Sequence, residues 1–110
     1  MKFFTYSQNN SGGGYEIDEE HGVGMYVIIE AENETEADKR FDEIGSKVDG
    51  MYDYCPCCGE RWYGCEDSEG DEVPSIYGTP IEEATAPYWD KTGFVHKNDG
   101  TFYPFTVKKD

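Results

Sequence analysis

The chain has 110 residues, a formal net charge of −15 at pH 7 and an aromatic content of 15%. This length suits one domain with a modest core, so we expect residues 1–110 to form a single domain. Residues 16–72 hold 19 acidic and 4 basic residues, so the middle of the chain carries the negative charge. Such a charge argues against direct binding to nucleic acid, because phosphate contacts need Lys and Arg, and it attracts basic proteins. The aromatic residues predict a folded core rich in Tyr and Phe, not a disordered acidic chain.

No stretch of the sequence approaches the roughly 20 apolar residues that a membrane-spanning helix needs. The opening residues 1–6 turn polar too soon for a signal peptide. We therefore expect a cytosolic protein without a membrane partner, in which cysteines stay reduced.

The first half of the chain predicts strands followed by a helix. Residues 2–7 and 15–18 are expected to be strands, and the apolar stretch 24–31 is expected to be a central strand covered on both faces. Asn33 is a predicted helix N-cap, with Glu36 three residues on to complete a capping box.

Three apolar residues of this helix, Ala37, Phe41 and Ile44, are spaced so that they share one buried face. Gly45 stands where a left-handed C-cap is expected. A short extended segment is expected over 47–54, leading into the cysteines.

The second half is broken by Pro and Gly. Residues 73–77 predict a short strand, which Pro74 places at an edge, and 81–84 predict one helical turn. Residues 93–107 predict a hairpin that turns at 97–100, because Asn-Asp-Gly lies between aromatic-rich arms.

Pro104 is expected to make the returning arm of this hairpin an edge or to shorten it. The pattern as a whole predicts the α+β class: a small antiparallel sheet, one helix packed on a face, and a loop-rich cysteine knuckle lobe.

All four cysteines lie within the eleven-residue segment CPCCGERWYGC, which starts at Cys55. Cys55 and Cys58 form a CxxC pair followed by Gly59, a spelling typical of a zinc knuckle. We expect Zn²⁺ as a structural ion, with ligands from Cys55, Cys57, Cys58 and Cys65.

The fourth ligand is left open between Cys57, His21 and His96. Reduced thiols packed in a turn, or a disulfide or redox pair, are the alternatives to zinc. Trp62 and Tyr63 are expected to cover the metal turn and join the core, with an exposed anchor at an interface as the alternative.

No catalytic residue is predicted, since the sequence lacks GxSxG, HExxH and a phosphate-cradling loop. His21 and His96 have no companions at catalytic spacing and are expected to be structural. The acidic residues are instead expected to bind a partner. They are Glu16, Asp18, Glu19, Glu20, Glu34, Glu36, Asp38, Asp42, Glu43, Glu66, Asp67, Glu69, Asp71 and Glu72.

Several segments resemble an uncharacterised family of small acidic tailed-bacteriophage proteins. They are FFTYSQNNSGG from Phe3, YVIIEA from Tyr26 running into the acidic helix, CPCCGERW from Cys55, and Ile76-Tyr77-Gly78. The likeness covers roughly residues 1–83. It implies a phage gene product that acts in the host bacterial cytoplasm, and it supplies no catalytic residues.

These observations favour a non-enzymatic phage accessory protein that binds and modulates a basic host protein. Its acidic surface would imitate nucleic acid and occupy the basic groove of a nucleic-acid-binding or defence enzyme. The alternatives are a small zinc- or nucleotide-dependent enzyme and a virion-associated structural protein.

Overall fold

A five-stranded sheet organises the molecule, seen here in a computed structural model. The structure describes residues 1–8, 17–48, 54–55, 59–60, 62, 65, 68–86 and 90–109. The strand order is β1-β2-β8-β9-β7. The bounds of these strands are β1 Lys2–Ser7, β2 Tyr26–Ala31, β7 Thr85–Ala86, β8 Lys91–His96 and β9 Phe102–Lys109.

The α+β class with one helix on one face is confirmed, but the sheet is not purely antiparallel. The β1–β2 and β8–β9 pairs are antiparallel, as expected of neighbours in sequence. The β2–β8 and β7–β9 pairs are parallel. The chain between β2 and β8 therefore crosses over the sheet before it returns, as parallel pairing requires.

Helix α1 (Glu34–Gly45) begins where the sequence predicts. Asn33 is the N-cap, and its side-chain oxygen accepts a hydrogen bond from the backbone N–H of Glu36 at 2.9 Å. Ala37, Phe41 and Ile44 are buried against β1 and β2. This confirms the predicted apolar stripe.

The end of α1 differs from the prediction. Gly45 is the last helical residue and is buried, and Ser46 takes the C-cap position with φ −65° in a right-handed conformation. The chain continues through further turns, with Lys47 N–H bonded to Ile44 O and Val48 N–H bonded to Gly45 O. Val48 is buried in the same core as α1, so burial of this apolar side chain overrides the local signal of the glycine.

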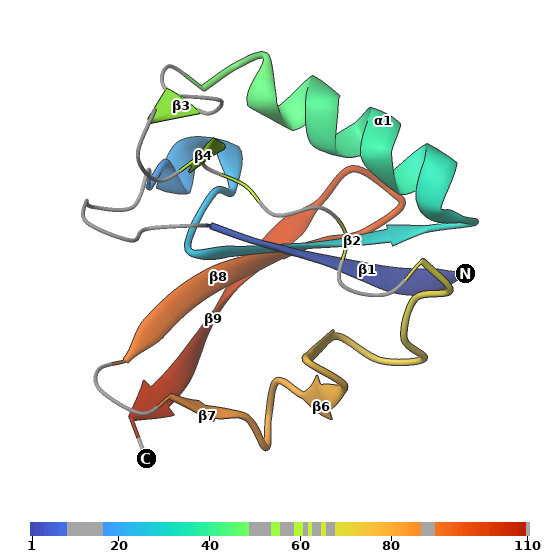
Figure 1. Ribbon diagram of the computed structural model, residues 1–110. Helices are drawn as coiled ribbons and strands as arrows, with labels where there is room; N and C mark the ends of the chain where they lie inside the picture. The colour runs from blue at the N-terminus through green and yellow to red at the C-terminus, as the bar shows by residue number, and fades with distance from the viewer. Residues whose placement is uncertain are drawn as a thin grey trace.

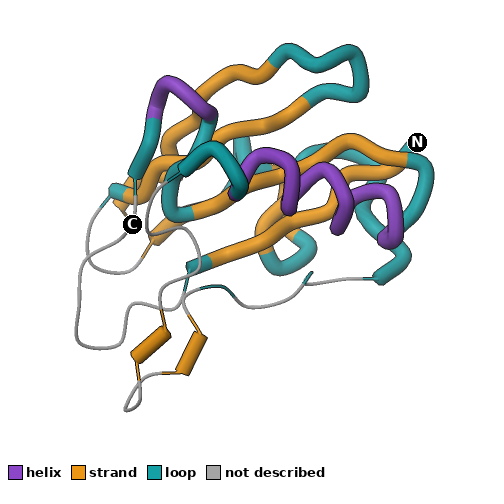
Figure 2. The backbone as a smooth tube through the Cα atoms, turned by 90° about the horizontal axis from the view of Figure 1, so that it is seen from above, coloured by secondary structure: helices purple, strands orange, loops and turns teal. Residues whose placement is uncertain are grey.

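The predicted second strand over 15–18 is not confirmed in its described part. Asp18 makes only an isolated bridge to Val23, and the short 3-10 helix η1 (Glu19–His21) lies between them. Both η1 and α1 lie on the same face of the sheet, as the view from above in Figure 2 shows. The segment that includes β6 covers the other face, where Ile76, Ile81 and Ala84 pack into the core (Figure 1).

Two cores result, one on each side of the sheet. On the α1 side Phe4, Val27 and Ile29 pack with Phe41 and Ile44. On the other side the core includes Tyr26, Ile28, Ile76, Ala86, Val95 and Val107. β2 contributes to both cores, which confirms that it is a central strand covered on both faces.

The predicted 73–77 strand is shorter than expected. Only β5 (Ser75–Ile76) is a strand, and it forms a hairpin with β6 (Thr79–Pro80). The two turn residues, Tyr77 and Gly78, both have positive φ, at 51° and 80°. The predicted helical turn follows, since the N–H groups of Glu83 and Ala84 both bond to Pro80 O.

The C-terminal hairpin is confirmed. His96 pairs with Phe102, and the turn is closed by a hydrogen bond from Gly100 N–H to Lys97 O at 3.0 Å. Pro104 pairs with Phe94 of β8. On the other side of β9, β7 pairs only with Lys108 and Lys109 and does not reach Pro104. No helix in the described part of the chain has the length and apolar character needed to cross a membrane.

We expect Gly100→Val to lower the free energy of unfolding by about 1–2 kcal/mol. Gly100 has φ 96°, and an added Cβ would meet no atom within 4 Å, so the loss comes from the backbone alone. Chemical denaturation measures it. Gly100→Asn is the matched control and should lose less, because Asn tolerates positive φ. Equal stability of Gly100→Val and the wild type would contradict the turn geometry.

Candidate functional site

The cysteine segment contains a small hairpin. β3 (Tyr54–Cys55) pairs with β4 (Gly59–Glu60), so that Cys55 stands opposite Gly59. This register brings the two ends of the Cys-Pro-Cys-Cys-Gly sequence together, as a knuckle requires. Cys57 and Cys58 lie outside the described residues, so the zinc site stays a prediction.

Cys65 and Trp62 connect this segment to the core. Trp62 is buried, and its ring meets Phe41 edge-on with centroids 5.1 Å apart. Cys65 is partly buried and packs against the same core. The expected burial of Trp62 is confirmed, whereas Tyr63 lies outside the described residues.

His96 is held by the scaffold. Its side chain is 1% exposed, and Nε2 donates a hydrogen bond to the backbone carbonyl of Gly22 at 2.7 Å. Nδ1 is buried with no hydrogen-bond partner among the described residues. Burial is the main cause that lowers the pKa of His96 below its usual 6.5, so the imidazole stays neutral. This geometry supports the structural role that was expected for His96.

The buried His96 makes stability depend on pH. Because its pKa is lower in the folded protein than in the unfolded chain, the unfolded chain binds the proton first as pH falls. The contribution of His96 is fully present above pH 6.5, and it declines as pH falls from 6.5 toward the lower folded-state pKa. We expect urea unfolding curves to show a steeper loss between about pH 7 and pH 5 for the wild type than for His96→Gln. Identical pH slopes in the two proteins would rule out this role.

The acids expected to bind a partner fall into three described groups, while Glu16, Glu66 and Asp67 lie outside the described residues. The first group lies at η1 and the second on α1. The third lies beside the outer edge of β1, where Phe3 and Asp71 exchange backbone hydrogen bonds of 2.9 Å. These groups are respectively Asp18, Glu19 and Glu20; Glu34, Glu36, Asp38, Asp42 and Glu43; and Glu69, Asp71 and Glu72.

Some of these acids have partners within the chain. Glu36 pairs with Lys39 at 3.8 Å and Glu43 pairs with Arg40 at 3.4 Å along α1, and Glu72 pairs with Lys2. Exposed pairs of this kind contribute little to stability. The two pairs on α1 do lower the negative charge that this helix presents to a partner.

Asp38 has a further structural contact. Its Oδ1 accepts a hydrogen bond from the hydroxyl of Tyr6 at 2.5 Å. Burial first, and then this carboxylate, raise the pKa of Tyr6 far above its usual value, so the phenol stays protonated. Asp38 therefore helps to hold α1 on β1, besides carrying charge.

A polar groove of about 530 Å³ lies between α1 and the β8–β9 turn. Its lining mixes both signs of charge, with Glu30, Glu36, Asp42 and Glu43 facing Lys39, Arg40 and Lys97. A second groove of about 450 Å³, lined in part by Tyr26, Tyr77 and Val107, lies on the opposite face.

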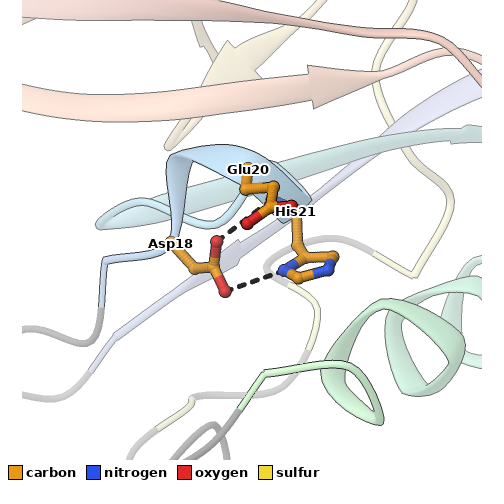
Figure 3. Close-up of side chains that lie close together, drawn as sticks. All are labelled: Asp18, Glu20 and His21. Carbon is orange, nitrogen blue, oxygen red and sulfur yellow. Dashed lines mark hydrogen bonds and ion pairs between the residues drawn. The ribbon is translucent and has the colours of Figure 1, made fainter.

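Asp18, Glu20 and His21 form a cluster that was not predicted from the sequence (Figure 3). One potential ligand atom from each lies within 4.8 Å of the other two. Asp18 Oδ2 contacts His21 Nδ1 at 2.8 Å, and Asp18 Oδ1 accepts the backbone N–H of His21 at 3.1 Å. The side-chain hydrogen bond to His21 is the main cause that holds the pKa of Asp18 below its usual value. A capping Asp with His three residues later is the sequence signal for this contact.

The fold and these features define a small acidic α+β domain with one helix on a mixed sheet. The chain belongs to a family described as "Domain of unknown function (DUF7296)", whose sequence model matches residues 1–110. No curated protein and no solved structure matches the chain.

Proposed function

We propose that the chain is a phage accessory protein that binds a basic host protein in the host bacterial cytoplasm and modulates it. The acidic surface formed by η1 and α1 imitates the charge of nucleic acid in this proposal. The observation that carries it is the placement of these acids. Asp18 caps η1, Glu19 and Glu20 belong to it, and five acids belong to α1. The elements η1 and α1 lie over the same face of the sheet (Figure 1).

The sheet supports this surface rigidly. Ala37, Phe41 and Ile44 anchor α1, while Val23 and the Gly22–His96 hydrogen bond anchor the chain just after η1. Fixed charges need little ordering when a partner binds, and this favours affinity. A field of one sign also raises the rate of encounter with a basic protein.

The internal ion pairs indicate which part of the acidic surface keeps more of its negative charge unbalanced. Lys39 and Arg40 offset charge along α1, whereas Asp18, Glu19 and Glu20 follow one another in sequence and have only His21 as a basic neighbour within the described part of η1 and its caps. We therefore assign the η1 end of this face to the closest contacts with a partner.

Binding is tested by capture from host lysate on the immobilised protein. We expect a captured protein to be released by raised salt and by added double-stranded DNA, because both compete for the same basic groove. The variant Glu19→Gln/Glu36→Gln should capture clearly less of it. The matched control Glu82→Gln/Glu83→Gln removes two exposed charges from the opposite face and should capture as much as the wild type.

Two outcomes count against this function. One is capture that resists both salt and DNA. The other is an equal loss in the two double variants, which would show that total charge matters and the η1–α1 face does not.

We also propose that a structural zinc ion holds the cysteine lobe, supported by the pairing of Cys55 with Gly59. Metal analysis of the purified protein is then expected to find one zinc per chain that depends on the cysteines. Cys58→Ser, or a chelator, should release it and lower the melting temperature, since structural zinc contributes folding energy. If the wild type contains no zinc and its melting temperature equals that of Cys58→Ser, the proposal of a zinc knuckle is wrong.

A further inference from the structure

We propose that Asp18, Glu20 and His21 form a second, separate site for a divalent first-row cation such as Mn²⁺ or Zn²⁺. The three ligand atoms, two carboxylate oxygens and one imidazole nitrogen, lie within 4.8 Å of one another (Figure 3). Ligand atoms about 2.0–2.2 Å from an ion stand at most about 4.4 Å apart. The exposed side chain of Glu20 therefore needs only a small movement to complete the set.

The backbone that carries these ligands is fixed on both sides. Asp18 and Val23 exchange two hydrogen bonds of 2.8 Å, and the N–H of Gly22 bonds to Glu19 O at 3.3 Å. Gly22 O in turn accepts the hydrogen bond from buried His96. The loop is closed at its base and tied to β8, so the backbone that carries the ligands is already in place when an ion binds.

The side chain of Asp18 is oriented as well. Oδ1 is occupied by the backbone N–H of His21, and Oδ2 points at the imidazole. Outer contacts of this kind orient a ligating carboxylate. An ion between Asp18 and His21 would replace the contact that the two side chains now make with each other.

The donor set indicates the class of ion. Ca²⁺ takes 6–8 oxygen ligands, whereas an imidazole beside two carboxylates suits Mn²⁺, Zn²⁺, Co²⁺ or Ni²⁺. Three protein ligands leave coordination positions for water. The imidazole sets this cluster apart from the exposed acids of α1, and the negative charge of the chain favours any cation there.

The test uses Mn²⁺ alone, because Mn²⁺ prefers oxygen ligands to the thiolates of the cysteine segment. The electron paramagnetic resonance signal of unbound Mn²⁺ measures the affinity and number of sites. We expect one site per chain. In amide NMR spectra, Mn²⁺ should broaden signals most strongly around residues 18–22.

Two neighbouring variants form the decisive comparison. Glu20→Gln and Glu19→Gln remove the same charge from adjacent, exposed positions of η1, and only Glu20 belongs to the cluster. We expect Glu20→Gln to weaken Mn²⁺ binding at least about tenfold, and Glu19→Gln to change it by less than about twofold. Asp18→Asn should weaken binding as well, and it keeps η1 capped because Asn caps as well as Asp.

The site is overturned if the wild type binds no Mn²⁺. Equal weakening in Glu19→Gln and Glu20→Gln, or broadening spread over all acidic segments, also overturns it, because either result means diffuse attraction of counterions. Failure of host-protein capture leaves the Mn²⁺ result unaffected, so the two proposals stand or fall separately.

Discussion

Replacing Phe41 with alanine is expected to lower the free energy of unfolding by about 3–5 kcal/mol. Phe41 is 6% exposed, stacks on Tyr6 with centroids 4.4 Å apart, and meets the edge of Trp62 at 5.1 Å. Its ring therefore joins α1, β1 and the cysteine segment. Removing the ring leaves a cavity that the paired strands beneath it cannot fill.

Urea denaturation with fluorescence of the two tryptophans measures this loss. Phe41→Leu is the matched control and is expected to cost only about 1–2 kcal/mol, because most of the volume and apolar surface remains. A loss below about 1 kcal/mol for Phe41→Ala would show that the three elements do not depend on one ring.

Gly22→Ala is expected to cost about 2–4 kcal/mol, the sum of a left-handed backbone and an overpacked contact. Gly22 has φ 73°, and an added Cβ would stand 2.6 Å from His96 Cε1 and 2.9 Å from Phe102 Cδ2. His96 cannot move aside easily, since its Nε2 bonds to the carbonyl of the same Gly22. The substitution therefore disturbs η1 and the β8–β9 hairpin together.

Gly78→Ala separates the two causes. Gly78 has φ 80°, and an added Cβ there would meet nothing within 4 Å, so only the backbone cost of about 1–2 kcal/mol applies. Thermal and chemical unfolding of the two variants should therefore differ clearly. Equal losses of unfolding free energy in the two variants would mean that Gly22 and His96 are farther apart than the structure shows.

The elements that the sequence predicts well are those with local signals. Asn33 and Glu36 mark the start of α1, and the turn ending at Gly100 marks the C-terminal hairpin. The predicted end of α1 was wrong because Val48, which lies beyond the expected cap at Gly45, is buried in the core. Burial of this side chain favours the further turns that follow the helix. Sequence signals for the end of a helix do not take into account such burial of a later residue.

Pairing between distant strands has no such signal. The parallel pairing of β2 with β8, which turns the expected antiparallel sheet into a mixed one, is decided by the second core, where Ile28 and Val95 pack together. The type of turn at Tyr77 and Gly78 was also missed, because Tyr rarely adopts positive φ.

The candidate site was predicted by composition and not by geometry. The acids of η1 and α1 were selected for their charge, and the structure adds which of them share a face. The contact of Asp18 with His21 depends on the short turn between them, and the link from Gly22 to His96 joins residues far apart in sequence. A motif search based on spacing therefore treats the two histidines as isolated.

The parallel pairing of β2 with β8 bears on how the chain folds as it is synthesised. Tyr26 pairs with Gly93, so one side of the apolar strand β2 has no partner until β8 has left the ribosome. The β1–β2 pair and α1 can form early, but contacts between such distant residues close slowly. The sheet should thus be completed only after β8 and β9 have been synthesised, and a chain that stops before β8 would expose β2 to aggregation.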